Sequence, residues 1–329
     1  MSTLLLCACG EQQQSASDKI HAGVICYNQS DTFLEQLITR FKEQLNELGG
    51  QEFKTTVTLR DAAGSQRTQN DQVKELIDAG CNVLCVNLVD RADPSEIIDL
   101  ARDNDVPIIF FNREPVAEDL MQWDKLYYVG AEAKQSGVMQ GELAADVIQA
   151  NSQIDRNKDG KIQYVVLEGE PGHQDAIIRT ENAVDTLKNK GIELEKLSYG
   201  IANWNRAQAQ NRMLLLISQY QSKIELVLAN NDDMALGGLA AFEQAGRSTE
   251  SVLFLGVDAS VGGCQAIAEG RMDFTVYQPT AAQITSAVEA AIRLASGRTI
   301  SDMEGASEDG RYILIPFEKV DRQNVAQYQ

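Results

Sequence analysis

Short apolar runs rich in valine, isoleucine and leucine alternate with longer amphipathic segments from Gly23 onward. This alternation is typical of β–α units built around parallel sheets. Between the first two runs, segment 32–48 has the spacing of an amphipathic helix, with Ser30 or Asp31 as a cap and Gly49–Gly50 at its end. The predicted buried strands are 21–27, 53–59, 82–88, 106–111, 161–168, 192–199, 224–229, 252–257 and 273–277.

The β–α pattern occurs twice along the chain. NVLCVNLVDRADP followed by VPIIFFNREP in the first half has a loose counterpart in IELVLANNDDMA followed by SVLFLGVDAS in the second half. One sheet holding all these strands would be unusually large. The 329 residues also exceed the usual size of one domain. We therefore predict two similar α/β domains joined by a hinge, with Tyr127–Ala131 as the first crossing between them.

The charge balance excludes some classes of partner. The chain carries 48 Asp and Glu against 29 Lys and Arg, a net charge of −19, and the acids are spread throughout. Nucleic-acid binding needs basic clusters that release counterions from phosphates, so nucleic acid is excluded as a partner. With 43% apolar and 23% charged residues, the composition is that of an ordinary globular protein. No apolar run reaches the roughly 18 residues of a membrane-spanning helix.

The N-terminal segment, MSTLLLCACGEQQQSASDK, has a short apolar run that ends in two cysteines and is followed by a polar tether. This order is similar to a lipoprotein signal, with Cys9 as the lipidated residue. We therefore treat residues 1–18 as a signal or tether outside the fold, and we expect a location in the periplasm or at the cell surface.

Polar side chains follow most of the predicted strands, where open α/β sheets bind their ligands. They are mostly planar groups with fixed donors and acceptors, which suit a polyhydroxylated ligand. Two aromatic rings, Phe33 and Trp204, can cover the C–H faces of a sugar. Each polar residue alone is more often a helix cap, so the inference depends on the whole set. The polar set is Asp31, Asn112, Asp175, Arg179, Asn231, Asp232 and Asp258.

Residues 155–163 match the first half of a calcium loop. Asp155, Asn157, Asp159 and Gly160 occupy the first, third, fifth and sixth positions of the D-x-[DN]-x-[DN]-G pattern, and Gln163 is ninth. The twelfth position, where a bidentate Glu is usual, is Val166. The alternative to a metal site is a solvated, charged turn.

At this level of detail the chain resembles the periplasmic galactose/glucose-binding proteins, which are sugar receptors of bacterial ABC import and chemotaxis. The resemblance runs from about Gly23 to Phe317. It is carried by QNDQVKELIDAG, VNLVD, FFNREP, YYVGAEAKQSG, DRNKDGKIQ, GEPGHQDA with Arg179, ANW, IELVLANNDDMA and GVDA.

The resemblance implies an α/β fold of the type I periplasmic binding protein class: two doubly wound parallel-sheet domains joined by a three-segment hinge. The first domain would comprise 19–131 plus 278–314, and the second 132–277 plus 315–329. Sugar would bind in the cleft between them. The positions matching the family's sugar contacts are Asp31, Phe33, Asn112, His173, Asp175, Arg179, Trp204, Asn231 and Asp258. Where the family has an Asn, this chain has Gln278, so its longer amide bears on sugar preference.

The resemblance also completes the calcium site. The family takes its last ligand from a remote strand, at a position that corresponds to Glu225 here. The implied ligand set is Asp155, Asn157, Asp159, the Lys161 carbonyl, Gln163 and Glu225, which supplies the 6–8 oxygens that calcium prefers. Calcium would then be a structural cofactor that fastens the loop to the second domain.

The implied function is that of an extracytoplasmic substrate-binding protein, which delivers a hexose, D-glucose or D-galactose, to an ABC permease. A chemoreceptor is a further implied partner, and a monomer is expected. A transcription regulator of the lactose-repressor type would need an N-terminal DNA-binding region, for which there is no room before the first strand. A sugar-sensing domain without a transport role is the other alternative. An enzyme is disfavoured because no nucleophile elbow, phosphate loop or histidine-rich metal site is present.

Overall fold

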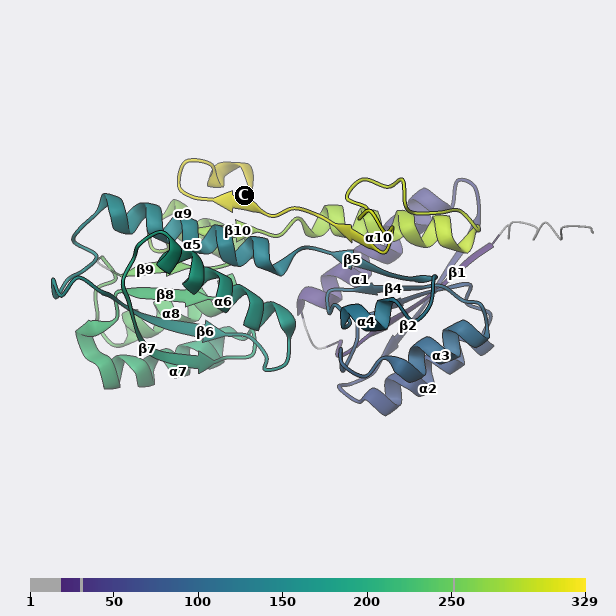
Figure 1. Ribbon diagram of the computed structural model, residues 1–329, viewed down its shortest axis with the longest axis horizontal. Helices are drawn as coiled ribbons and strands as arrows, with labels where there is room; N and C mark the ends of the chain where they lie inside the picture. The colour runs from purple at the N-terminus through teal and green to yellow at the C-terminus, as the bar shows by residue number, and fades with distance from the viewer. Residues whose placement is uncertain (1–18, 30–31, 251) are drawn as a thin grey trace, which may run out of the picture.

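The computed structural model describes residues 19–29, 32–250 and 252–329, which form two α/β lobes (Figure 1). We call them the N-lobe and the C-lobe. The N-lobe sheet has the strand order β2–β1–β3–β4–β5–β11, and all its pairings are parallel. Its strands are β1 (Lys19–Cys26), β2 (Lys54–Asp61), β3 (Val83–Val86), β4 (Ile108–Phe111), β5 (Leu126–Gly130) and β11 (Tyr312–Leu314).

Helices cover both faces of the N-lobe sheet. Helices α1 (Thr32–Gln44) and α10 (Thr280–Ala295) pack on one face, and α2 (Gln66–Asp78) and α3 (Ser95–Asp103) pack on the other. Helix α4 (Ala117–Leu120) lies between β4 and β5 in the chain. The inner strands β1, β3, β4 and β5 are largely buried between the two helix layers, which explains their continuous apolar runs. The edge strands β2 and β11 are mostly half-buried.

The C-lobe repeats this arrangement on a smaller sheet. Strands β6 (Ile162–Glu168), β7 (Leu194–Ile201), β8 (Leu226–Ala229) and β9 (Leu253–Leu255) pair in parallel in the order β7–β6–β8–β9. Single bridges extend the sheet from β9 to β10 (Thr275–Tyr277), which pairs antiparallel with β12 (Glu318–Val320). Helices α5 (Ala133–Ala150) and α6 (Gln174–Asn189) cover one face. Helices α7 (Arg206–Tyr220), α8 (Asp232–Gln244) and α9 (Val261–Ala268) cover the other.

The chain passes between the lobes three times: after Gly130, between Tyr277 and Thr280, and between Leu314 and Glu318. In Figure 1 these connections run along the top of the view. The predicted α/β class with two parallel sheets is confirmed. In the part of the chain that the structure describes, no helix has the length and apolar character needed to cross a membrane.

Two local expectations need correction. Residues 127–130 belong to strand β5, because Tyr128 and Val129 fit the interior of the N-lobe, so the first crossing begins only after Gly130. The predicted continuous helix 32–48 is regular only to Gln44, and a π-helical turn (Leu45–Gly49) follows it. Strands β11 and β12, of three residues each, are not among the strands predicted from the sequence.

Candidate sugar-binding site

The predicted ligand residues lie at the carboxyl ends of the parallel strands. In the N-lobe, Asn112 follows β4. The remaining described residues of this kind follow strands of the C-lobe. They are His173 and Asp175 after β6, Trp204 after β7, Asn231 after β8, Asp258 after β9 and Gln278 after β10. Asp31 lies outside the described residues. Phe33 belongs to α1, but its side chain also lies outside what the structure describes.

Arg179 is the best-connected of these side chains. It is 3% exposed, and its guanidinium pairs with Asp175 at 3.0 Å between Nη2 and Oδ2. Nη1 donates to the Asn230 carbonyl at 3.0 Å, and Nε donates to Ser136 Oγ at 3.2 Å. Nη2 also donates to Gln278 Oε1 at 3.4 Å, so the longer amide at this position is turned towards Arg179. A buried guanidinium satisfied in this way holds a fixed orientation, which suits recognition of hydroxyl oxygens.

Two other site residues cap helices. His173 Nδ1 accepts from the Asp175 amide at 3.2 Å at the start of α6, and Asn231 Oδ1 accepts from the Met234 amide at 2.9 Å at the start of α8. Asn231 Nδ2 donates to the Trp204 carbonyl at 3.3 Å. A side-chain amide has two N–H groups and two lone pairs, so Asn231 still has capacity for a ligand. The capping role and the ligand role are therefore compatible.

Trp204 lies over Gly169 at the end of β6. A Cβ added at Gly169 would meet the indole ring at 2.2 Å, so only glycine allows this close approach. The ring also packs edge-on against His173, with centroids 5.1 Å apart and an interplanar angle of 74°. The indole is partly exposed, which leaves part of its surface available to a ligand.

Three predicted site residues have unusual backbone conformations. The φ angles are 59° at Asn112, 61° at Trp204 and 115° at Asp258, among nine described non-glycine residues with positive φ. Such conformations cost free energy and persist where the surrounding structure enforces them, commonly at ligand sites. Their concentration at the strand ends supports a binding site independently of residue type.

The electrostatics of the site depend on burial. Burial raises the pKa of the Asp258 carboxyl well above its usual range, and Arg179 opposes this rise. A ligand hydroxyl that donates to the charged carboxylate would favour ionisation.

Two contacts between the lobes are absent from the sequence-based expectations. Arg113, next to Asn112, forms an ion pair with Glu170 of the C-lobe. Its guanidinium lies 3.7 Å from the centre of the Tyr27 ring, and Nη1 donates to the Val89 carbonyl at 3.0 Å. Gln174 Nε2 donates to the Asn112 carbonyl at 3.4 Å. Both acidic and basic partners lie in stretches that the sequence singled out, but no spacing in the sequence reveals a pair across two lobes.

The predicted calcium loop is closed by its own side chains. Asp155 accepts from the amides of Asp159 and Gly160, and Asp159 Oδ2 accepts from Asn157 and Gln163 at 2.9 Å each. Positive φ at Lys158 and Gly160, 59° and 81°, makes the tight turn. The loop therefore gathers four oxygen-bearing side chains within one small network.

The remote Glu225 is 1% exposed and bridges both ends of this loop. Its Oε1 accepts from the Arg156 amide at 2.7 Å, and its Oε2 accepts from the Gln163 amide at 3.0 Å. Burial raises the pKa of Glu225, and these main-chain donors lower it. The described residues contain no group of three or more His, Cys, Asp or Glu side chains spaced for a metal ion. A metal here would need amide and main-chain oxygens as well, and calcium is the common ion that accepts them.

Known proteins are similar to this chain over most of its length. A family model described as a periplasmic binding protein domain matches residues 22–299. The D-galactose/methyl-galactoside binding periplasmic protein of Haemophilus influenzae is 34% identical, over 98% of this chain and 95% of its own length. A putative rhizopine-binding protein of Rhizobium meliloti is 32% identical, over 82% of this chain and 81% of its own.

Solved structures give the same result for the fold. An ABC transporter solute binding protein from Bacillus halodurans, with bound myo-inositol, superposes with a TM-score of 0.77 and 27% identity. The match covers 96% of this chain and 98% of the other. A solute binding protein from Actinobacillus succinogenes with bound D-allose gives a TM-score of 0.78 at 20% identity, over 94% and 100% of the two chains.

Proposed function

The chain belongs to the periplasmic binding protein family, and from this premise we propose that it binds a monosaccharide between its lobes and delivers it to an ABC permease. The observation that carries the proposal is the buried Arg179 cluster, in which one guanidinium holds Asp175 and Gln278 close to the strand ends. Rigid planar donors and acceptors are what hydroxyl recognition requires. The protein would act outside the cytoplasm by reversible binding, without turnover.

We propose D-galactose or D-glucose as the ligand. The relative from Haemophilus influenzae is described as a binder of D-galactose and methyl-galactoside, and the described residues expected to contact sugar fall at the strand ends in both lobes. Trp204 would cover one C–H face of the ring, and Phe33 the other. Asn112, His173, Asn231 and Asp258 would hydrogen-bond the hydroxyls. Gln278 would tune the preference among pyranoses through its contact with Arg179.

Calorimetric titration with D-galactose, D-glucose, D-ribose and myo-inositol tests this proposal directly. We expect the two hexoses to bind most tightly and Trp204→Ala to weaken hexose binding at least tenfold, because one ring face loses its aromatic contact. Trp123, the other tryptophan, lies in the N-lobe before β5 and provides the matched control, Trp123→Ala. Failure of both hexoses to bind, or an unchanged affinity in Trp204→Ala, contradicts the proposal.

We further propose that sugar closes the lobes, because its contacts are divided between them. A ligand that touches both halves binds the closed form better and shifts the population towards it. The closed form is then what the permease, or a chemoreceptor, would recognise. Small-angle scattering should show a smaller radius of gyration at saturation with sugar, and an unchanged radius rules out closure as the signal.

We propose calcium as a structural cofactor of the loop at 155–163. Asp155, Asn157, Asp159, Gln163 and the Lys161 carbonyl would hold it together with Glu225, which is already fixed at both ends of the loop. The ion would add charge compensation and rigidity to the C-lobe. Direct titration with calcium tests the site, and Glu225→Gln should weaken binding more than tenfold.

Attachment of a lipid through Cys9 is a separate proposal about the N-terminal segment, which lies outside the described residues. Expression in a Gram-negative host should yield membrane-associated protein, and Cys9→Ser should release it. Cys7→Ser is the matched control, because only a residue at the lipidation position should alter the partition.

A further inference from the structure

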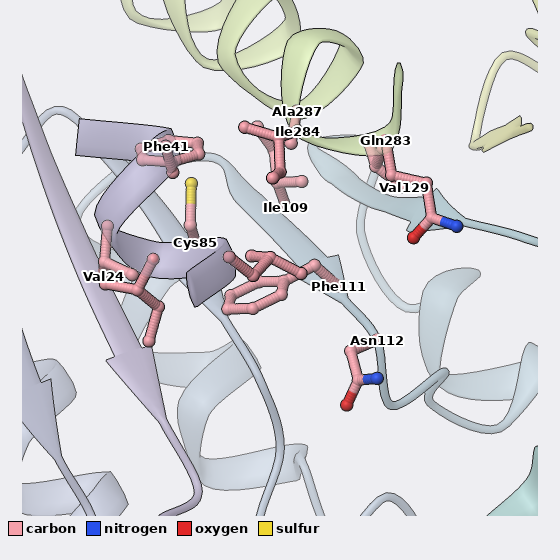
Figure 2. Close-up of a pocket in the computed structure, with 12 residues that line it drawn as sticks. Val24, Phe41, Cys85, Ile109, Phe111, Asn112, Val129, Gln283, Ile284 and Ala287 are labelled. Carbon is pink, nitrogen blue, oxygen red and sulfur yellow. The ribbon is translucent and has the colours of Figure 1, made fainter. Parts of the chain in front are cut away.

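A small cavity lies in the N-lobe between α1, α10 and the sheet. Ten of its twelve lining residues are apolar, among them Phe41, Phe111 and Ala287, and the other two are Asn112 and Gln283 (Figure 2). The cavity offers about 20 Å³ to a water-sized sphere, which is room for one water or one methyl group. Asn112, a residue of the candidate sugar site, also lines this cavity and is partly exposed.

Gln283, one of the lining residues, has a side-chain donor without a partner among the described residues. The residue is 6% exposed, and none of the described groups accepts a hydrogen bond from its Nε2. Figure 2 shows its amide extending down from α10, on the same side of the cavity as the amide of Asn112. A buried donor without a partner costs free energy in the ligand-free protein, so a bound acceptor here would recover it.

The polarity of the lining residues determines which kind of ligand group fits the cavity. A buried water usually makes about three hydrogen bonds, whereas this cavity has only two polar side chains, both amides. A methyl group needs no partner and gains from burial against the apolar wall. An oxygen beside that methyl can accept from Gln283 Nε2.

We propose that this cavity is a subsite of the sugar site and that it binds a methyl group of the sugar. Gln283 would donate a hydrogen bond to the sugar oxygen next to that methyl group. The proposal rests on the proposed function, and it names the substrate class: a 6-deoxyhexopyranose, in which methyl replaces the hydroxymethyl group on the ring. Gln283 is then a specificity-determining residue in addition to those that the sequence indicated.

A matched sugar series separates the subsite from the proposed function. D-Galactose, D-fucose and L-arabinose share one ring configuration and carry hydroxymethyl, methyl and hydrogen on the same ring carbon. Binding of D-galactose tests the proposed function. The ratio of D-fucose to L-arabinose affinity tests the subsite, and we expect about a fourfold preference for D-fucose, the gain of burying one methyl-sized group.

Two variants test the subsite through different groups. Ala287→Val should fill the cavity and abolish the preference for D-fucose over L-arabinose, whereas Ala281→Val, at an exposed position of the same helix, should keep it. Gln283→Met should weaken all three sugars roughly three- to tenfold and leave their ratio unchanged. It should not lower the melting temperature of the ligand-free protein, because Nε2 has no described partner to lose.

The outcomes are distinguishable. Binding of D-galactose with equal affinities for D-fucose and L-arabinose overturns the subsite alone, as does an unaltered preference in a folded Ala287→Val. A drop in melting temperature with unchanged affinity in Gln283→Met assigns this residue a packing role and overturns its proposed one. Binding of D-glucose but of none of the three sugars overturns the subsite alone, and failure to bind D-glucose as well overturns the proposed function.

Discussion

The two halves of the candidate site differ in how far they are formed before any ligand binds. On the C-lobe side, Arg179, Asp175 and Asn231 are held by ion pairs, caps and main-chain acceptors of the same lobe. On the N-lobe side, Asn112 Oδ1 accepts from Asn87 at 3.0 Å, but the Nε2 of Gln283, at the small cavity, has no acceptor in the part of the chain that the structure describes. The C-lobe half is thus preorganised, and the N-lobe half would be completed by the ligand.

This difference has a cause in the secondary structure. His173 and Asn231 are the N-caps of α6 and α8, where first-turn amides donate to their side chains, and Arg179 lies one turn beyond Asp175 on α6. Preorganised groups lose little entropy on binding, so most of the orientation of a ligand should come from the C-lobe. We therefore expect changes in the C-lobe to have the larger effects.

The largest effect should follow from Arg179→Met, which leaves Asp175, whose side chain is only 14% exposed, without its partner. Breaking a buried pair in this way costs about 3–5 kcal/mol of stability, and hexose affinity should fall more than a hundredfold. Calorimetry and thermal unfolding measure the two quantities. The double variant Arg179→Met with Asp175→Leu should recover stability, since a wholly apolar pair needs no charge compensation, but it should not recover binding. Full affinity in the single variant would contradict a preorganised C-lobe half.

A second effect should be confined to the C-lobe. If calcium binds the loop at 155–163, saturation at a hundred times the dissociation constant stabilises that lobe by about 2.7 kcal/mol. Chelation should then raise hydrogen exchange in β6 and β8 while leaving β1 and β3 unchanged. Asp155→Ala and Glu225→Gln should each remove the response. Asp99→Ala, an exposed acid of the N-lobe, should retain it. Equal responses in both lobes, or none, contradict a local calcium site.

Gly169→Ala should shift Trp204, because the added Cβ would meet its ring at 2.2 Å. Overpacking of this kind costs about 1–3 kcal/mol, and part of this should appear as weaker sugar binding. Gly200→Ala is the control, since its Cβ would have its closest neighbour at 3.6 Å. Near-ultraviolet circular dichroism and calorimetry should show a changed indole environment and roughly tenfold weaker binding in Gly169→Ala only. Unchanged binding with a displaced indole would argue against the aromatic contact.

The preorganised half is more predictable from sequence than the other. Strand periodicity locates β6, β8 and β9, so the residues that follow these strands are predicted to share one edge of a sheet. The prediction of a crossing at Tyr127–Ala131 is wrong because that stretch combines aromatic residues with glycine, and only the packing of the N-lobe shows that most of it is the buried strand β5. Short apolar runs do not reveal which neighbour they will bury against.

The sequence does not predict the cavity or the donor of Gln283 that lacks a described partner, and the reason is different. Gln283 shares a row of α10 with Ala287 and Ala291, so helical spacing places it on the buried face, but no sequence pattern shows whether its amide finds a hydrogen-bond partner there. A void in a core depends on the shapes of side chains from four or more elements, and pattern and composition carry no information on it.

The smallest effect concerns the contact that joins the two halves. Of the ion pairs between described residues, Arg113–Glu170 links the lobes, and the Glu170 side chain is 38% exposed. Solvent screening limits such a pair to about 0.5–1 kcal/mol, so Glu170→Gln should weaken sugar binding only two- to fivefold by disfavouring the closed form. Because the attraction is electrostatic, the loss should shrink as salt rises.

A double-mutant cycle separates this pairing from the other contacts of Arg113, which also stacks on Tyr27 and donates to the Val89 carbonyl. Arg113→Met should lower affinity more than Glu170→Gln, since it loses all three contacts. The double variant should be less affected than the sum of the two singles, by an interaction energy of about 0.5–1 kcal/mol. Lobe separation measured by spin labels in the ligand-free protein should increase in both single variants. An interaction energy of zero, together with an unaltered distance between the lobes, would contradict a role for this ion pair. The lobes would then be coupled by the ligand alone, and the N-lobe half would contribute to closure only through the sugar that it binds.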